Sequence, residues 1–253
     1  MDMENNSEKV YIYDIPFSKW GMKDTVDYLT QSIKERKPHQ VVTANPIIVM
    51  ESKHNDTYKK AVQQADLVVP DGTGIVWAAD YIGHPVKERV GGFDLMHELL
   101  SIGEQYEWKV YLLGAEDEVV KEAAHNMSKQ FPSLRIVGVR DGYFTESEDA
   151  EVIADIQKVQ PDLLFVARSV NTQEPWIAKY KQQLQVPLMM GVGGSFDVIA
   201  GKLKRAPKLF IQLRLEWFYR LLQQPTRYKR MLALPKFVMQ VRKDKKKLQQ
   251  ANL

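Results

Sequence analysis

Cysteine is absent from the 253 residues of this chain. That absence excludes a disulfide framework, a thiolate zinc site and a cysteine nucleophile, and it fits a reducing cytoplasm. Long apolar runs are missing as well, since none approaches the ~20 residues that a helix needs to cross a bilayer. The first residues, 1–16, are polar and acidic and lack the apolar segment of a signal peptide. We therefore expect a cytoplasmic chain that, if it works at a membrane, lies on its surface.

Several catalytic motifs are also missing. The first strand–turn–helix carries no GxGxxG and the chain has no GxSxG, which disfavours a nicotinamide dehydrogenase and a hydrolase of the GxSxG type. There is no DxD pair to hold a metal–diphosphate complex, and the five histidines show no HxH or HxxxH spacing. We therefore expect no metal and no resident cofactor.

Acidic residues are scarce in the last part of the chain. Residues 201–253 carry 15 Lys and Arg against 2 Asp and Glu, a net charge of +13, whereas residues 1–200 carry 20 against 30, a net charge of −10. The overall net charge of +3 is therefore the balance of an acidic body and a basic tail. Such a tail suits an anionic partner, either nucleic acid, a phospholipid surface or an anionic substrate.

The body alternates short β-branched runs with longer amphipathic segments, which predicts an α/β fold with a largely parallel, Rossmann-like sheet and helices on both faces. Val110–Leu113 and Leu163–Ala167 lack polar alternation, as expected for central strands covered on both faces. No strand is predicted after Gly201. We expect a catalytic α/β domain at 1–201 and a basic, amphipathic, helical appendage at 202–253.

The appendage has the composition of an interfacial helix. Pro207 can start a helix that runs through Leu222, in which aromatic residues alternate with Lys and Arg. This mixture is typical of a helix that lies on an anionic membrane. A helix packed on the body and a surface for single-stranded nucleic acid are the alternatives. The acidic body disfavours nucleic acid because it would repel a polyanion.

Polar residues follow the expected strands, where ligands bind in parallel sheets. Thr43 and Asn45 offer a hydroxyl and an amide beside the helix that starts at Pro46, although helix capping is the commoner use of such residues. Asp71 lies in the segment VPDGTG and offers a carboxylate that can act as a general base toward a sugar hydroxyl. The same segment is also an ideal turn.

Three further segments offer ligand contacts. Arg89 precedes two glycines and can clamp a phosphate, although a surface ion pair is commoner. Gln173 and Glu174 can hold a nucleobase or sugar hydroxyls, or only supply charge at a helix start. After the last strand, in GVGGSFD, Gly193 and Gly194 can bring backbone amides against a diphosphate, with tight strand–helix packing as the alternative.

Taken in order, these motifs resemble the WecG/TagA/CpsF family of glycosyltransferases over about residues 10–237. The combination of GVGGSFD, RAP and LEWFYRL is highly specific for that family. The segments that carry the resemblance are TANP (43–46), PDGTG (70–74), RVGGFD (89–94), QEPW (173–176), GVGGSFD (191–197), RAP (205–207) and LEWFYRL (215–221).

The resemblance implies an inverting enzyme that moves N-acetylmannosamine from UDP-ManNAc to the C4 hydroxyl of GlcNAc on undecaprenyl diphosphate, forming a β-1,4 linkage in wall teichoic acid synthesis. The implied partners are a UDP-sugar donor, a polyprenyl-diphosphate-linked acceptor and an anionic membrane surface, with no nucleic acid and no metal. The implied location is the inner face of the cell membrane, as a peripheral protein.

The resemblance also implies roles for individual residues. The general-base role falls on Asp71, and substrate-pocket roles fall on Thr43, Asn45, Arg89 and Gln173. The appendage arginines that it assigns to the diphosphate are Arg214, Arg220, Arg227 and Arg230.

One segment departs from the family. Where members read ALGxPxQExW, this chain reads ARSVNTQEPW, so that Arg168 is new and Ser169 and Asn171 replace a glycine and a proline. The loop shape and the donor preference are therefore open. The alternatives are another donor, such as UDP-ManNAcA or UDP-glucose, and a non-catalytic nucleotide-binding membrane adaptor. The sequence leaves a homo-oligomer open as well.

Overall fold

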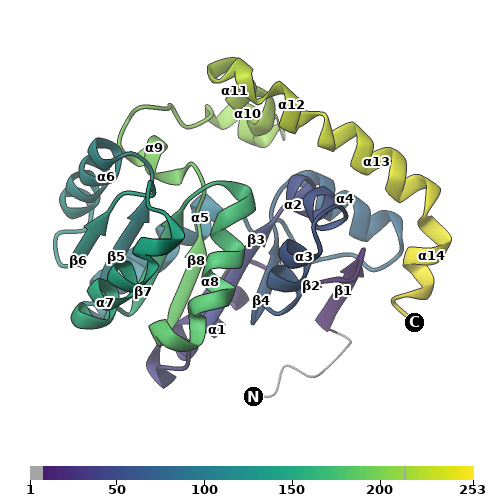
Figure 1. Ribbon diagram of the computed structural model, residues 1–253. Helices are drawn as coiled ribbons and strands as arrows, with labels where there is room; N and C mark the ends of the chain where they lie inside the picture. The colour runs from purple at the N-terminus through teal and green to yellow at the C-terminus, as the bar shows by residue number, and fades with distance from the viewer. Residues whose placement is uncertain (1–7, 214) are drawn as a thin grey trace.

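The computed structural model describes residues 8–213 and 215–253, and its described strands form one eight-stranded sheet (Figure 1). The strand order is β1-β2-β4-β3-β8-β7-β5-β6; β1 runs antiparallel to β2 and the other pairings are parallel. The strands are β1 (Lys9–Ile12), β2 (Ile15–Ser18), β3 (His39–Ala44), β4 (Leu67–Pro70), β5 (Lys109–Gly114), β6 (Arg135–Arg140), β7 (Leu163–Ala167) and β8 (Leu188–Gly191).

Helices cover both faces of this sheet, so the expected α/β fold is confirmed. One face packs against α1, α5, α6 and α9, and the other against α2, α3, α4, α7 and α8. These helices are α1 (Met22–Glu35), α2 (Pro46–Ser52), α3 (Asp56–Gln63), α4 (Thr73–Tyr81), α5 (Gly92–Gln105), α6 (Asp117–Gln130), α7 (Asp149–Val159), α8 (Val170–Leu184) and α9 (Ser195–Ile199), with the 3₁₀ helix η2 (Glu146–Glu148) before α7.

The central strands are apolar because both of their faces are covered. Every residue of β7 is buried, and so is every residue of β5 after Lys109. Side chains alternate between the two layers; Val41 belongs to one core cluster and Val42 to the other. This arrangement fixes the carboxyl ends of the parallel strands in one row, where the polar residues after each strand come together.

The amino-terminal strand forms a hairpin that the sequence did not reveal. Tyr13 and Asp14 adopt left-handed conformations (φ 53° and 65°) and turn the chain into β2. Pro16 lies within β2 and argued against a strand there, because proline is found in sheets only at positions where its missing N–H is not needed. The hairpin adds β1 and β2 beside β4 and leaves β1 at the edge.

The appendage divides into two parts, which we call the lid and the strap. The lid comprises the described residues 208–213 and 215–231, with α10 (Lys208–Gln212), α11 (Glu216–Gln223), the 3₁₀ helix η3 (Pro225–Arg227) and α12 (Tyr228–Met231). The strap comprises residues 233–253, with α13 (Ala233–Lys243) and α14 (Lys245–Gln250). Figure 1 shows the lid above the sheet and the strap descending along one side toward β1.

The lid is not the single helix expected from Pro207 to Leu222. Its described residues form α10 and α11 as separate helices, and the Leu215 N–H donates to the Phe210 carbonyl at 2.7 Å. The fold packs the Phe210 ring against that of Tyr219, with centroids 5.2 Å apart. The first residue of α11, Glu216, contacts Arg89 of the body.

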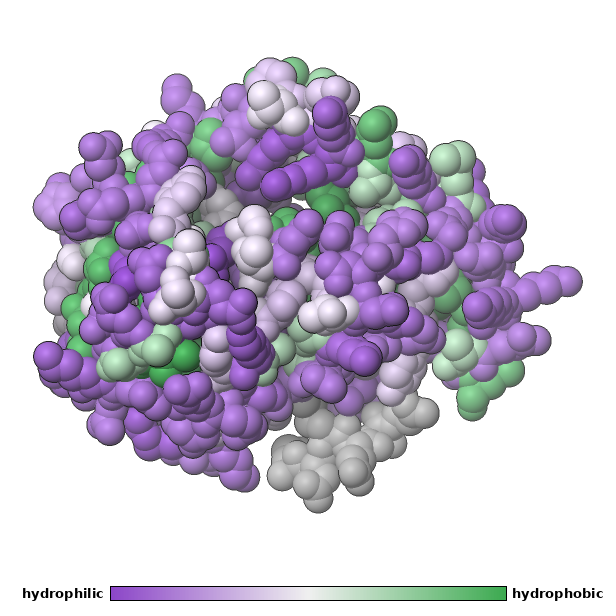
Figure 2. All heavy atoms as spheres, viewed as in Figure 1, coloured by the Kyte–Doolittle hydropathy of each residue, from purple (hydrophilic) through white to green (hydrophobic). Residues whose placement is uncertain are grey.

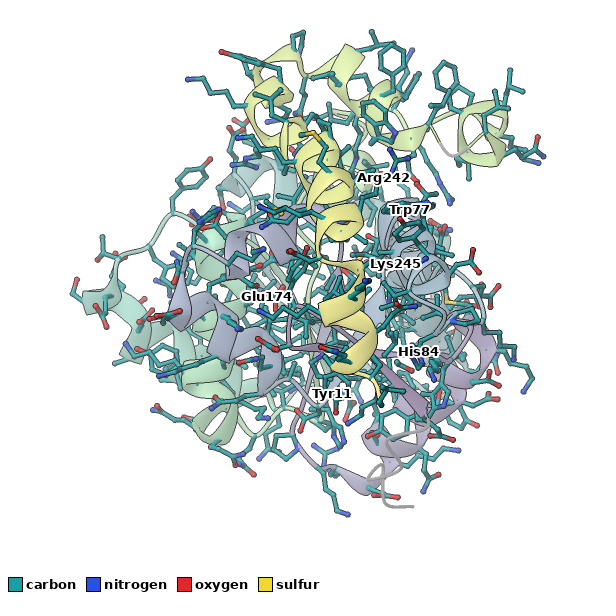
Figure 3. All side chains as sticks on the ribbon, turned by 90° about the vertical axis from the view of Figure 1, so that its right-hand side faces the viewer. Tyr11, Trp77, His84, Glu174, Arg242 and Lys245 are labelled. Carbon is teal, nitrogen blue, oxygen red and sulfur yellow. The ribbon has the colours of Figure 1, made fainter. Side chains whose placement is uncertain are left out.

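The strap is embedded in the body. Phe237, Val241 and Leu248 are buried in the same cluster as residues of α2, α3 and α4. Arg242 lies over the Trp77 ring, and Figure 3 labels both from the side of the strap. Lys245 lies over the Tyr81 ring. The expected boundary at residue 201 stays a prediction, but the strap shares a hydrophobic core with the body.

Candidate functional site

Asp71 lies directly after β4, at the row of carboxyl strand ends. Its backbone N–H donates to the Ala44 carbonyl at 3.0 Å, which ties it to the end of β3. Its carboxylate accepts a hydrogen bond from Arg89 Nε at 3.2 Å and one from the Gly92 backbone N–H. The Asp71 side chain is 22% exposed, so it is accessible to a ligand yet largely withdrawn from water.

Arg89 joins Asp71 to the lid. Its Nη2 donates to Glu216 Oε2 at 3.0 Å, and Glu216 is the first residue of α11. Burial is the largest influence on the pKa of Asp71 and raises it; Arg89 lowers it, and the negative charge of Glu216 raises it further, with a net rise. The result is a carboxylate that is more basic than an ordinary aspartate.

Thr43 and Asn45 lie at the end of β3, beside Asp71. Asn45 Oδ1 caps α2 by accepting from the N–H groups of Ile47 and Ile48 at 2.9 and 3.2 Å, so the capping interpretation holds for this atom. Thr43 Oγ1 would lie 2.7 Å from a Cβ placed on Gly92. Only glycine therefore fits between Thr43 and the start of α5.

Gln173 and Glu174 lie on the first turns of α8, but they face different surroundings. Gln173 Oε1 accepts from the Gly193 N–H at 3.2 Å, which joins α8 to the glycine loop after β8. Glu174 is 1% exposed and accepts hydrogen bonds from Gln173 Nε2 at 2.9 Å and Gln40 Nε2 at 3.2 Å. Burial raises the pKa of Glu174 to about 7.

Glu174 is buried in this structure, and its expected contact with substrate stays a prediction. A Cβ on Gly191 would collide with the side chains of both Gln173 and Glu174. Glu174 therefore supports Gln173 and the glycine loop from behind.

The glycine loop faces the lid. A Cβ on Gly194 would lie 3.4 Å from Arg227 Nη2, which places this arginine directly against the loop. Burial and the positive charges of Arg220 and Arg230 lower the pKa of Arg227, so the three guanidinium groups lie near one another. None of the three forms an ion pair with a described residue. Arg214 lies outside the described residues.

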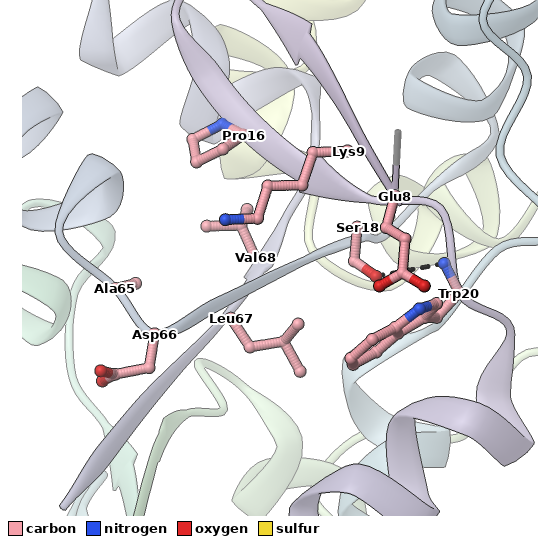
Figure 4. Close-up of a pocket in the computed structure, with 9 residues that line it drawn as sticks. All are labelled: Glu8, Lys9, Pro16, Ser18, Trp20, Ala65, Asp66, Leu67 and Val68. Atoms are coloured by element: carbon pink, nitrogen blue, oxygen red, sulfur yellow. Dashed lines mark hydrogen bonds between the residues drawn. The ribbon is translucent and has the colours of Figure 1, made fainter. Parts of the chain in front are cut away.

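The two described pockets lie away from Asp71 and Arg89. The pocket of Figure 4 lies beside the start of β4, next to Asp66 and Trp20, and its volume of about 20 Å³ suits about one water. A groove of about 590 Å³ between α3 and α8 is lined by Lys60, Asn171 and Arg168 among others. Arg168 stacks on the Phe144 ring at 4.0 Å and donates to the Phe144 carbonyl at 3.1 Å.

Among the described residues, no group of three or more His, Asp or Glu side chains is placed to hold a metal ion. No helix in the described part of the chain is both long enough and apolar enough to cross a bilayer.

The fold and the site define an α/β enzyme whose carboxylate and arginines meet at the carboxyl edge of its sheet, where such folds bind nucleotides. More narrowly, the chain belongs to the glycosyl transferase WecG/TagA/CpsF family, whose model matches residues 10–251. The family expected from the sequence motifs is confirmed.

Similar proteins from three bacteria are each named N-acetylglucosaminyldiphosphoundecaprenol N-acetyl-beta-D-mannosaminyltransferase. The protein of Bacillus spizizenii is 39% identical over 86% of this chain and 84% of its own. The protein of Bacillus subtilis is 34% identical over 93% of this chain and 91% of its own. The protein of Staphylococcus aureus is 34% identical over 99% of both chains.

Sequence reasoning missed two residues of the site. Gln40 lies inside β3 and gives no signal in the sequence, since its role depends on the partner from α8. Glu216 did carry a signal: it is one of only two acidic residues among the last 53. An isolated acid in a basic segment indicates a specific cationic partner, and here that partner is Arg89.

Proposed function

We propose that this protein transfers N-acetylmannosamine from UDP-ManNAc to the C4 hydroxyl of GlcNAc on undecaprenyl diphosphate, forming a β-1,4 linkage, in wall teichoic acid linkage-unit synthesis. The names of its relatives support the acceptor and the transferred sugar. The observation that carries the proposal is the Asp71–Arg89 pair at the carboxyl edge of the sheet, under the start of α11.

In this proposal Asp71 is the general base. Its oxygen takes the proton of the acceptor hydroxyl while the hydroxyl oxygen attacks the anomeric carbon and the bond to UDP breaks, which inverts that carbon. A raised pKa suits this task, because a base whose pKa lies nearer the working pH accepts the proton more readily. Thr43, Asn45 and Gln173 would orient the sugars.

The leaving UDP would be stabilised by arginine instead of metal. Arg227 lies beside Gly194, with Arg220 and Arg230 near it, and none of the three forms an ion pair within the described residues, so their charge is available to a diphosphate. Preorganised cations of this kind stabilise charge that develops in the transition state. The Gly193 N–H already donates a hydrogen bond to Gln173 and is not free for the diphosphate. The glycine loop would therefore contribute mainly by letting the diphosphate come close to the backbone.

The lid would lie on the inner face of the cell membrane. It exposes large apolar side chains between basic ones, and Figure 2 shows hydrophobic groups among hydrophilic ones along the top of the molecule, where Figure 1 places the lid. Such a surface binds anionic lipid through apolar contact and charge together. The exposed apolar residues are Leu209, Leu213, Trp217, Phe218, Leu222 and Tyr228.

A transfer assay tests the donor. UDP-ManNAc, UDP-ManNAcA and UDP-glucose are each incubated with a short-chain GlcNAc–diphosphate–lipid, and the product is identified by mass. We expect rapid transfer from UDP-ManNAc alone. Faster transfer from another donor would reassign the sugar, and no transfer from any donor would leave a nucleotide-binding adaptor as the better description.

The substitution Asp71→Asn tests the base. We expect kcat to fall by about a hundredfold or more, with UDP binding nearly unchanged, because the amide cannot accept the proton. Wild-type kcat/KM should fall as pH is lowered through the raised pKa of Asp71, since protonation removes the base. Asp80→Asn, at an exposed acid of α4, is the matched control and should behave as wild type.

A further inference from the structure

Arg89 is held between two carboxylates that come from distant parts of the chain. Its Nε donates to Asp71 at 3.2 Å and its Nη2 donates to Glu216 at 3.0 Å. Asp71 belongs to the body and Glu216 to the lid, 145 positions later in the sequence. The guanidinium therefore bridges the two parts.

Each carboxylate of the bridge takes a different nitrogen of Arg89. The rigid fork of a guanidinium presents its N–H groups in fixed directions, so a partner on one nitrogen orients the others. Glu216 on Nη2 directs Nε toward Asp71, and Nη1 has no partner among the described residues. One donor group thus remains for a ligand oxygen.

All three side chains are similarly withdrawn from solvent. Exposure is 22% for Asp71 and 27% for both Arg89 and Glu216. Charges in such surroundings interact more strongly than charges on an open surface. The bridge holds two negative charges and one positive charge, so its net charge is −1 when the lid is closed.

Two charged groups act on the Asp71 carboxyl: Arg89, from the loop before α5, and Glu216, from α11. Nearby, Asp94 of α5 forms an ion pair with Arg205, which is a second ion pair between the body and the appendage. Removing the charge of Glu216 therefore leaves Asp71 facing Arg89 alone.

We propose that Glu216 is a positioning residue: by holding Arg89, it makes the basicity of Asp71 depend on closure of the lid. With the lid closed, the second carboxylate offsets the cation beside the base. With the lid open, Arg89 pairs with Asp71 alone and stabilises its carboxylate, which weakens it as a base. Asp71 is thereby at its most basic, and transfer fastest, only when the lid covers the site. This inference rests on the general-base role proposed for Asp71.

The test compares pH profiles of kcat/KM for wild type, Glu216→Gln and Glu216→Ala. A short-chain, water-soluble GlcNAc–diphosphate–lipid acceptor keeps membrane binding out of the measurement. In Glu216→Gln the acid limb should move to lower pH by about 0.5–1 unit, because a like charge near Asp71 is gone. Glu216→Ala should show the same shift and a further fall in kcat/KM of about tenfold, because Arg89 loses its hydrogen bond as well.

Asp244→Asn is the matched control, since Asp244 is the other acidic residue of the appendage and belongs to the strap. Its acid limb should coincide with that of wild type. A melting curve for each variant shows that the fold is retained, and a purely structural role of Glu216 would lower the rate without moving the limb.

The outcomes separate the two proposals. If Asp71→Asn is inactive and the acid limb of Glu216→Gln coincides with that of wild type, the positioning role is overturned and the general base stands. If Asp71→Asn turns over like wild type, the general base itself falls, and the role of Glu216 falls with it.

Discussion

The lid and the strap are neighbouring parts of one basic segment, yet they are attached to the body by different forces. The described helices of the lid contain no buried residue, and the lid meets the body at Glu216–Arg89 and at Arg227 beside Gly194. The strap buries Phe237 and Val241 completely. A similar excess of basic residues thus serves two kinds of attachment.

The difference indicates which part can move. Ion pairs at partly exposed positions are screened by salt and contribute less than the burial of large apolar side chains, so the contacts of the lid can be exchanged for lipid or substrate. Burying a large apolar side chain is worth about 1.5–3 kcal/mol and is not subject to screening by salt. We expect the strap to stay in place while the lid opens and closes.

The largest effect should come from the core of the strap. Phe237→Ala should lower the free energy of unfolding by about 3–5 kcal/mol, because it leaves a cavity among α2, α4 and α13. Chemical denaturation measures the change. Leu222→Ala, at an exposed residue of the lid, is the counterpart and should change it by less than about 0.5 kcal/mol. Equal losses for both variants would abolish the distinction between lid and strap.

An intermediate effect should appear in membrane binding. Replacing Trp217 and Phe218 together by alanine should weaken binding to vesicles of anionic lipid by about tenfold or more, since both rings are exposed and would enter the interface. Co-sedimentation with the vesicles measures the affinity. Met239→Ala removes an exposed apolar side chain of the strap and should leave binding nearly unchanged. A comparable loss in this control would place the strap on the membrane too.

The smallest effect should come from the end of the strap. Asn252 receives a hydrogen bond from the Tyr11 N–H at 2.7 Å and donates one to the Tyr11 carbonyl at 2.9 Å. Asn252→Ala should lower the free energy of unfolding by about 1–2 kcal/mol and leave transfer activity intact. Gln249→Ala, one turn earlier and without such bonds, should be neutral. Lost activity in Asn252→Ala would show that the strap reaches the site.

The sequence predicted the sheet well because its signals are local. Apolar runs such as Leu163–Ala167 and the capping residue Asn45 act within a few positions of themselves. Asp71 and Arg89 could be placed at the carboxyl edge because parallel strands end in one row. Their contact was not predicted, but both had been singled out.

The features that the sequence did not predict depend on contacts between distant segments. Glu174 has the charge of a ligand-binding residue, and only the packing of α8 against β3 shows that it is buried. Glu216 acts through Arg89, which is 127 residues away. The division of the described lid residues into α10 and α11 was not predicted either, since the sequence is amphipathic on both sides of it.

The pairing of Asn252 with Tyr11 has a consequence for association between molecules. An edge strand presents free N–H and C=O groups to any other strand that approaches it, and here a side-chain amide occupies both groups of one residue in the middle of β1. At the opposite edge, β6 begins and ends with arginine, and Arg140 pairs with Glu151 and Asp155. If two copies of this chain associate, they do not meet by extending the sheet through Tyr11.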